Sequence, residues 1–446
     1  MPRARLVTAG ERSPTSHRGG GMTLDDTAHR SATGTGAPAV PAAAGPPESG
    51  GVWRRMGLWG AAHAVDDFYQ GLVPAVVPYF ALDRGYDYVA VGGLAMAATV
   101  GSAVPQPFVG LAVDRWRLGG TAALGVALAG VGLGAAGLVS SYAAVWLLVL
   151  LSGLGVAMFH PAAGRSAREA AGGSTTAMSV FAAGGSVGFF LAPVLATPVL
   201  AAWGVRSTVL FVPPALITGW VLLRHRQRQR ERERAVATAA AAPAGPDRWP
   251  PFLVLTGVEV ARSVVFFGVS TFLELHWLRD LHASHALAGA ALAGFLGGGV
   301  AGTLLGGQLA DRIGAVAAVR LGTALTVPAL AGLCLAPGGL LPLVFAVLTG
   351  AALNVPFAVM VKLGQDYLPG RPGTAAGVTL GLGVSAAGLC GPLLGLVARA
   401  HGPQGVLAAL CAVPLLGLLL AYALVEPGAA GRVGLPGGRF RPRGRA

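Results

Sequence analysis

Long runs of apolar residues, nearly free of charge, recur along most of this chain. Two of them, Gly120 to Val139 and Pro403 to Val425, reach the ~20 residues that a helix needs to cross ~30 Å of hydrocarbon. Several other runs are of similar length, which excludes a single membrane anchor. The hydrophobic pattern therefore predicts an all-α integral membrane protein that crosses the bilayer many times.

The apolar runs fall into two sets of six, separated by a polar stretch. The predicted spans lie near residues 57–81, 88–112, 120–139, 143–163, 175–200 and 204–223, and then near 250–275, 287–309, 315–336, 341–361, 373–398 and 404–425. Residues 51–223 and 250–425 would form two six-helix halves, joined by a basic linker at 224–249 and flanked by tails at 1–50 and 426–446. We therefore expect twelve transmembrane helices in two halves.

An internal repeat supports the two halves independently of hydropathy. The stretch Gly110-Leu-Ala-Val-Asp114-Arg115 recurs 197 positions later as Gly307-Gln-Leu-Ala-Asp311-Arg312. Each copy stands at the end of the second predicted helix of its half. Six-helix halves that repeat in parallel are related by pseudo-symmetry and place a binding site between them, near the bilayer midplane.

Composition agrees with a chain whose main solvent is lipid. Only 11% of the residues are charged and 54% are hydrophobic, whereas a soluble domain carries about 25% charged residues. The 69 glycines would weaken soluble helices, but small residues allow helices to approach closely in a membrane.

The net charge of +13 raises the possibility of nucleic-acid binding. The placement of the basic residues decides between nucleic-acid binding and membrane orientation. With both termini cytoplasmic, most of the 32 Lys and Arg residues fall in cytoplasmic segments, as short loops of inner-membrane proteins require. The arginine-rich stretch 224–234 is then a solvated cytoplasmic loop. The charge predicts membrane orientation and lipid contact, not nucleic acid.

The remaining composition adds little chemistry. Residues 1–50 are rich in Gly, Pro, Ala, Ser and Thr, which predicts a disordered cytoplasmic tail without a signal-peptide core. The cysteines Cys334, Cys390 and Cys411 match no disulfide or zinc spacing. We expect neither a metal nor a cofactor.

The first predicted span carries ionisable residues that lipid does not tolerate. His63, Asp66 and Asp67 would each cost at least ~2.5 kcal/mol at the bilayer centre unless they face protein or water. His63 and Asp67 are four residues apart on one helical face, which Gln70 continues. A carboxylate in a low-dielectric medium can exchange protons near neutrality, so Asp67, with Asp66 and His63, is the predicted proton-coupling group. The alternative is a fixed His-Asp pair that joins two helices.

The seventh span carries Glu259 and Arg262, three residues apart. An arginine fork in a cavity suits a carboxylate, phosphate or phosphonate, so both residues are predicted to bind substrate. The alternative is a pair in which they neutralise each other. His160, before Pro161, is a candidate for substrate binding or proton relay, or for a simple helix-end hydrogen bond. Asn354 is expected to make an interhelical hydrogen bond.

The paired Gly-x-x-x-Asp-Arg loops resemble the signature of the major facilitator superfamily. That resemblance implies a conformational role at the interdomain loops for Gly110, Asp114 and Arg115 and for their counterparts Gly307, Asp311 and Arg312. The second copy continues with Ile313-Gly314 as the family pattern does, whereas the first reads Trp116-Arg117.

Within that superfamily, residues 57–425 resemble the fosmidomycin-resistance type of efflux protein. The matching stretches are His63-Ala-Val-Asp-Asp67-Phe-Tyr-Gln-Gly-Leu-Val-Pro74, Phe159-His160-Pro161, Gly184-Gly-Ser-Val-Gly188 and Gly302-Thr-Leu-Leu-Gly-Gly307. Asp66 stands where that type has Asn, and Ala162 stands where it has Glu. The second departure removes a carboxylate that could take part in coupling.

The sequence and the resemblance together predict a monomeric proton-coupled secondary transporter of the inner membrane. It would export a drug or a small metabolite, anionic ones included, by alternating access of two halves around a central cavity. A proton-coupled importer of a small organic anion is the first alternative. An enzyme has no support, because no nucleophile motif, metal cluster or soluble catalytic domain is recognisable, and a membrane sensor is the weaker alternative.

Overall fold

The computed structural model describes residues 49–86, 88–235 and 245–427, and within these ranges the chain forms helices and no strand. These residues belong to one compact unit, Pro47–Ala446. Nearly all of the two predicted tails and the middle of the predicted linker lie outside the described residues. For the described chain, the predicted all-helical fold is confirmed.

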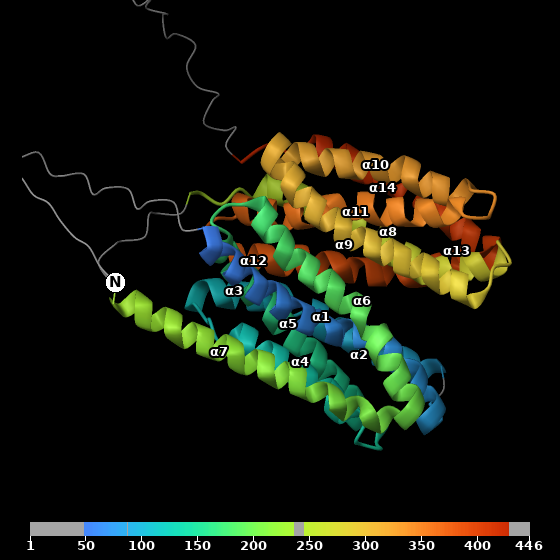
Figure 1. The fold of residues 1–446 in the computed structure, drawn as a ribbon, viewed down its shortest axis with the longest axis horizontal. Coiled ribbons are helices and arrows are strands. Elements are labelled where there is room, and N and C mark those ends of the chain that lie inside the picture. The colour runs from blue at the N-terminus through green and yellow to red at the C-terminus, as the bar shows by residue number, and fades with distance from the viewer. Residues whose placement is uncertain (1–48, 87, 236–244, 428–446) are drawn as a thin grey trace, which may run out of the picture. The chain divides into compact units, whose positions relative to one another are not determined.

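The described residues of the N-terminal half form seven α-helices, labelled in Figure 1. They are α1 (Ser49–Arg84), α2 (Tyr88–Ala103), α3 (Gln106–Trp116), α4 (Thr121–Ala136), α5 (Tyr142–Ala171), α6 (Thr175–Trp203) and, after a 3₁₀ turn at Val205–Phe211, α7 (Val212–Ala235).

The C-terminal half also contains seven. They are α8 (Trp249–Arg279), α9 (His285–Ile313), α10 (Ala315–Leu335), α11 (Leu341–Tyr367), α12 (Pro372–Gly377), α13 (Gly383–Leu410) and α14 (Val413–Tyr422), with a π-helical turn at Val378–Leu382 between α12 and α13. Figure 1 shows the helices of each half lying together, blue to yellow-green for the first and yellow to red for the second.

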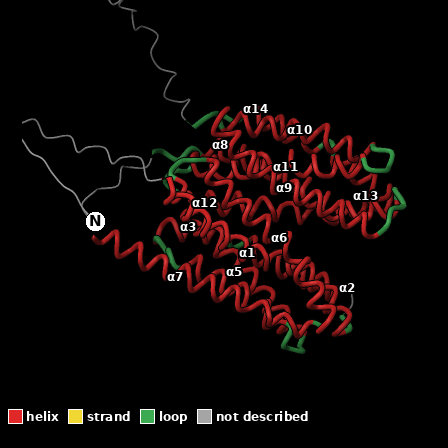
Figure 2. The backbone as a smooth tube through the Cα atoms, in the orientation of Figure 1, coloured by secondary structure: helices red, strands yellow, loops and turns green. Residues whose placement is uncertain are grey.

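Local residues explain where the helices are interrupted. Pro105, which lacks a backbone N–H, separates α2 from α3. Gly402, with φ of 71°, interrupts α13 in a conformation that glycine adopts readily. Figure 2 shows the described chain as helices, in red, joined by loops, in green.

Nine segments of the described chain are long and apolar enough to cross a membrane, and α4 is a shorter apolar helix. Helix α1 is not among the nine, and it carries His63, Asp66 and Asp67 near its middle. The two-halved helical fold agrees with the prediction, and the count of twelve spans stays a prediction.

Several helices extend beyond the apolar runs that predicted them. Helix α7 continues through the arginine-rich stretch to Ala235, and α5 continues to Ala171, well past the expected end at residue 163. Arg, Gln, Glu and Ala favour helices in water, so these helices continue where the apolar pattern ends.

Small residues bring helices of each half into backbone contact. A side chain at Gly184 or Gly188 of α6 would collide with the backbone of Gly60 or Ala64 in α1. In the second half, a side chain at Gly302 of α9 would collide with the backbone of α11 in the same way. The glycine content therefore serves close helix packing, as expected for helices in lipid.

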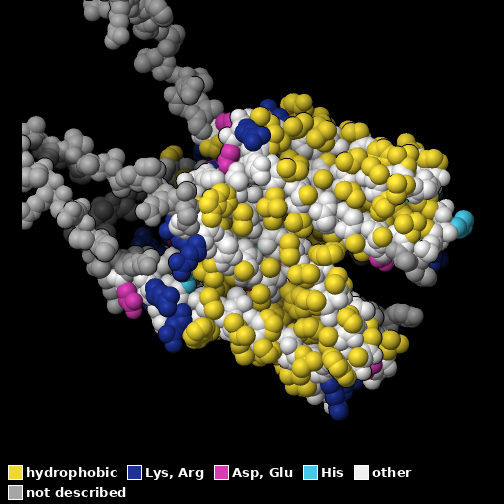
Figure 3. Space-filling model, in the orientation of Figure 1, with side chains coloured by type: hydrophobic (Ala, Val, Ile, Leu, Met, Phe, Trp, Pro, Cys, Tyr) yellow, Lys and Arg dark blue, Asp and Glu magenta, His cyan; other side chains and the backbone are white. Residues whose placement is uncertain are grey.

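The surface separates apolar sides from one strongly basic end. Large exposed hydrophobic residues cover the flanks of both halves, and Lys and Arg side chains gather mostly at the end where α3, α7 and α9 terminate (Figure 3). We call this end the basic end. Figure 3 also shows a notch between the two halves at the opposite end.

Candidate functional site

A cavity of about 70 Å³ lies between the two halves. It is lined by His63, Asp67, Gln70, His160, Gly185, Ser186, Phe189, Arg262, Phe266, Phe267, Asn354, Phe357 and Leu380. Helices α1, α5 and α6 supply one wall, and α8, α11 and the π-helical turn supply the other. Five residues that the sequence predicted for the site, His63, Asp67, Gln70, His160 and Arg262, therefore line one cavity.

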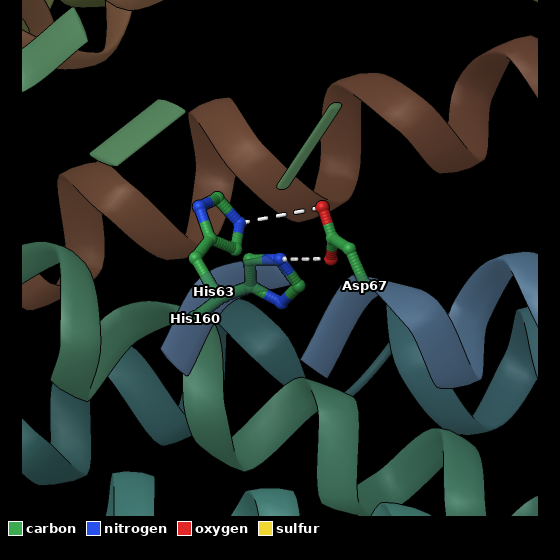
Figure 4. A group of neighbouring side chains, drawn as sticks. All are labelled: His63, Asp67 and His160. Carbon is green, nitrogen blue, oxygen red and sulfur yellow. Dashed lines mark ion pairs between the residues drawn. The ribbon is translucent and has the colours of Figure 1, made fainter. Parts of the chain in front are cut away.

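Two histidines hold the carboxylate of Asp67 (Figure 4). His63 and Asp67 face each other because they are one helical turn apart on α1, with 3.3 Å between His63 Nε2 and Asp67 Oδ2. His160 comes from α5 and places its Nε2 3.1 Å from Oδ1 of the same carboxylate. Asp67 stays 16% exposed, whereas both histidines are buried.

The opposite ring nitrogen of each histidine meets a backbone carbonyl. His63 Nδ1 lies 2.8 Å from the oxygen of Phe181, and His160 Nδ1 lies 3.0 Å from the oxygen of Val156. The His63 ring also stacks on the Phe181 ring, with 4.2 Å between centroids. A carbonyl oxygen only accepts hydrogen bonds, so each Nδ1 donates and each Nε2 is directed at Asp67.

Asp66 lies behind the cavity instead of lining it. Its side chain is fully buried, and neither carboxylate oxygen has a hydrogen-bond partner among the described residues. Its ion-pair partner is His160, whose Nδ1 lies 3.7 Å from Asp66 Oδ2. His160 therefore stands between the buried Asp66 and the cavity-facing Asp67.

Arg262 and Glu259 form the neutralising pair that the sequence left open as an alternative. Arg262 donates from Nε and Nη2 to the two oxygens of Glu259 at 3.0 and 2.7 Å. Its Nη1 donates to Asn354 Oδ1 at 3.3 Å, and its guanidinium carbon lies 4.5 Å from the centroid of the Phe357 ring. Arg262 lines the cavity and Glu259 does not. Within the described chain, no ion pair joins Arg262 to Asp66 or Asp67.

The two loop aspartates each cap a helix of the other half. Asp114 accepts hydrogen bonds from the backbone N–H groups of Gly373 and Thr374, at 2.8 and 2.7 Å, at the start of α12. Asp311 accepts from those of Thr175 and Thr176, both at 2.9 Å, at the start of α6. A carboxylate at a helix N-terminus satisfies free N–H groups and the helix dipole together.

The loop glycines permit this approach. A Cβ on Gly110 would lie 2.7 Å from the carbonyl oxygen of Gly373, and one on Gly307 would lie 2.7 Å from that of Thr175. Arg115 and Arg312, the last members of the two motifs, are exposed in the final turns of α3 and α9. The motif glycines and aspartates therefore join the halves at the basic end.

Further contacts at the basic end were not apparent from the sequence. Arg168 Nη1 lies 2.6 Å from Asp366 Oδ1, and Gln365 Nε2 donates to the carbonyl of Gly164 at 2.9 Å. The phenylalanines that line the central cavity were also missed. Aromatic residues are common in apolar helices, so only the packing of the two halves shows that these phenylalanines line the cavity.

Comparison with known proteins finds one family. The model for the Major Facilitator Superfamily matches residues 59–275 and 255–443. The Fosmidomycin resistance protein of Escherichia coli (strain K12) is 26% identical over 398 residues, which cover 82% of this chain and 92% of that protein.

Solved structures show a similar arrangement of helices. The E. coli fucose:proton symporter FucP matches with a TM-score of 0.64 and 14% identity, over 84% of this chain and 100% of that one. A structure of FucP in the outward conformation also gives a TM-score of 0.64, at 14% identity and over 83% of this chain and 98% of that one. At this identity the likeness concerns the fold alone.

Proposed function

This chain belongs to the Major Facilitator Superfamily, and on that premise we propose that it is a proton-coupled exporter of a drug or small metabolite. As a family member it is a multi-pass membrane transporter and not an enzyme. The observation that carries the proposal is the cavity between the halves, where a carboxylate held by two imidazoles and an arginine line opposite walls.

Asp67 is the proposed proton-coupling group. Its carboxylate lines the cavity and contacts His63 and His160, which share the charge as protons arrive or leave. Asp66 is the proposed second acidic group, linked to Asp67 through the His160 ring. An ionisable residue within a membrane span is costly and is generally retained for function.

Substrate binding is assigned to Arg262, Gln70 and His160, and Glu259, which does not line the cavity, orients Arg262. Arg262 offers its guanidinium plane to the cavity from α8, while Gln70 and His160 line the wall across from it. The rings of Phe266 and Phe357 lie 5.9 and 4.5 Å from the guanidinium carbon and add apolar surface. This combination favours a small anion with an apolar part, because planar guanidinium groups suit oxyanions.

The basic end is proposed to be cytoplasmic, with both termini inside the cell and the protein acting as a monomer in the inner membrane. The positive-inside rule supports this orientation. The inter-half caps of Asp114 and Asp311 lie at that end, and the notch lies at the other. The conformation is then outward-facing, the state in which an exporter releases substrate and takes up protons.

Export is favoured over import by the relationship to a protein named for drug resistance. A transporter that protects a cell from a drug does so by lowering the drug concentration inside. Alternating access then exchanges an inward-moving proton for an outward-moving substrate.

Expression in a bacterial host that lacks its own efflux pumps tests this function. We expect the protein to raise the growth-inhibitory concentration of at least one drug in a panel that includes fosmidomycin. Asp67→Asn should abolish the protection, while Asp280→Asn, an aspartate outside the cavity, should keep it. Sensitisation of the host would instead favour import of a small organic anion.

A further inference from the structure

We propose that His63, Asp67 and His160 form a binding site for a divalent transition-metal ion of the Zn²⁺ class. The site lies in the same cavity as the proposed transport site, but its ligand geometry supports it independently of transport. This site is not apparent from the sequence, because the third ligand comes from a different helix, 93 positions beyond Asp67.

The three side chains lie close enough together to share one metal ion. One ligand atom from each lies within 4.8 Å of the others. His63 Nε2 lies 3.3 Å from Oδ2 of Asp67, and His160 Nε2 lies 3.1 Å from Oδ1. Ligands about 2.0–2.1 Å from a tetrahedral Zn²⁺ are separated from each other by about 3.3 Å. One ion can therefore contact all three side chains once they draw together around it.

The hydrogen atoms on the rings favour a cation between these groups. Since the carbonyls of Phe181 and Val156 accept from the Nδ1 atoms, a neutral ring directs an Nε2 lone pair at the Asp67 carboxylate. Lone pairs of nitrogen and oxygen repel each other at such distances. His63 Nε2 is buried and has no hydrogen-bond partner among the described residues. Two added protons or one metal ion would relieve this arrangement.

The surroundings match those of metal-binding histidines. Such a histidine usually donates its second N–H to a carbonyl or carboxylate, which fixes the tautomer and the ring orientation. His63 and His160 both do so here, and His63 is held further by its stacking on Phe181. The rings are thus oriented before any ion binds.

The ligand set also selects the class of ion. Two imidazole nitrogens and one carboxylate suit Zn²⁺, Co²⁺ or Ni²⁺, whereas Mg²⁺ and Ca²⁺ require mostly oxygen ligands. Three protein ligands leave a fourth position open, as in zinc sites that bind water or substrate. That position would face the cavity, where a water molecule or an anionic substrate could complete the coordination.

A second His-Asp pair provides a matched control. His276 and Asp280 of α8 are also four residues apart, and His276 is equally buried, with 2.8 Å between Nδ1 and the carboxylate. Among the described residues, only the trio of His63, Asp67 and His160 brings three potential ligands together. The pair at His276 should therefore not bind the ion tightly.

Titration of the purified full-length protein with Co²⁺ tests the proposal. The protein carries no histidine tag, and Cys334, Cys390 and Cys411 are replaced by alanine to remove thiol ligands. We expect bound Co²⁺ to show the visible absorption bands of a low-symmetry site. Added Zn²⁺ should displace the Co²⁺ and abolish these bands. His63→Gln and His160→Gln should each weaken the affinity at least ~100-fold, because even loss of an outer-shell partner costs 10–100-fold. His276→Gln should bind like the parent protein.

Thermal unfolding separates lost binding from lost folding. Zn²⁺ should raise the melting temperature of the parent and of His276→Gln, but not of folded His63→Gln or His160→Gln. Absence of Co²⁺ bands in the parent, or equal affinity in all four proteins, would overturn the proposal. Neither the Co²⁺ absorption nor the melting temperature depends on transport. Proton-driven transport measured in chelator-treated buffer tests the proposed function separately.

Discussion

At the residue scale, each charged side chain that lines the cavity is surrounded by a few specific partners. Asp67 is held by two imidazoles, and Arg262 is held by Glu259, Asn354 and the face of Phe357. In a medium of low dielectric, each charge depends on its partners, so loss of one partner changes the whole group. Substitutions that keep shape and change only charge or geometry are therefore the informative ones.

Asp67→Asn should fold and express like the parent but lose proton-driven accumulation of substrate. The amide nearly preserves the shape of the carboxylate and cannot release a proton near neutrality. Energised membrane vesicles measure accumulation, and substrate exchange without a proton gradient serves as the control and should persist. If accumulation driven by a pH gradient remains, the coupling proton lies elsewhere, and Asp66 becomes the next candidate.

Arg262→Lys should weaken the binding of an anionic substrate by about tenfold or more, equivalent to at least ~1.4 kcal/mol. Lysine keeps the charge but loses the planar fork that now spans both oxygens of Glu259. Equilibrium binding to the purified protein measures the effect. Unchanged binding in Arg262→Lys and in the double variant Glu259→Ala with Arg262→Ala would make the pair purely structural.

The site was partly predictable at this scale. His63, Asp67 and Gln70 share one helix, so their common face follows from 3.6 residues per turn. The sequence could not decide whether Arg262 faces Glu259 or a carboxylate of α1, because that depends on side-chain conformations in a cavity formed by both halves. The contact of His160 with Asp67 depends on how α5 packs against α1.

At the element scale, the inter-half caps are the feature that holds one end closed. Asp114 caps α12 and Asp311 caps α6, each across the boundary between the halves. Loss of a helix-capping side chain typically costs about 0.5–2 kcal/mol. Because the capped helix and the aspartate lie in different halves, this free energy acts on the closure of the basic end.

Asp311→Ala should open the basic end more often. Ser179 of α6 is buried against Gly307 of α9, so a cysteine there reports on that opening. The assay uses inverted vesicles and a Ser179→Cys variant that lacks the native cysteines. Adding Asp311→Ala should make this cysteine react with a thiol reagent about fivefold faster, because losing a helix cap of ~1 kcal/mol shifts the opening equilibrium by that factor.

Asp280 supplies the control for this experiment, since it caps the backbone N–H of Gln404 within the second half at 2.8 Å. Asp280→Ala should leave the labelling rate of Ser179→Cys unchanged. Equal rates in all three backgrounds would mean that the cap of Asp311 does not govern closure of the basic end.

The elements themselves were largely predictable, and their ends were not. Apolar runs located most helices, yet α7 continues to Ala235 through residues that hydropathy reads as a loop. The break at Gly402 falls between two predicted spans, while the break at Pro105 divides one predicted span into α2 and α3. Hydropathy indicates which segments lie in lipid, whereas the ends of helices depend on capping groups, proline and glycine.

At the scale of the whole molecule, the repeat of six helices explains why the two caps correspond. Each motif aspartate lies at the end of the second predicted helix of its half, and each caps the fifth predicted helix of the other half. The sequence showed the repeat, but it could not show that the capping contacts cross between the halves. The conformation, closed at the basic end, likewise depends on contacts between distant segments.

The basic end should be cytoplasmic. Gln229 is exposed near the end of α7, and Ser140 is exposed between α4 and α5; these two segments lie at opposite ends of the molecule (Figure 1). Cysteines placed singly at the two positions, after the native cysteines are removed, should differ in their labelling in intact cells. A membrane-impermeant thiol reagent should label Ser140→Cys and not Gln229→Cys until the cells are permeabilised. Labelling of Gln229→Cys from outside would reverse the proposed orientation.

Proton movement coupled to substrate movement is the most direct test of the central claim. Inverted vesicles are acidified inside by respiration, and a pH-sensitive dye reports the lumen while a drug that the protein confers resistance to is added. The account predicts that the drug releases lumenal protons in vesicles with the parent protein and not in those with Asp67→Asn. Proton release that is absent from the parent, or equal in the two, would contradict a proton-coupled exporter working through this cavity.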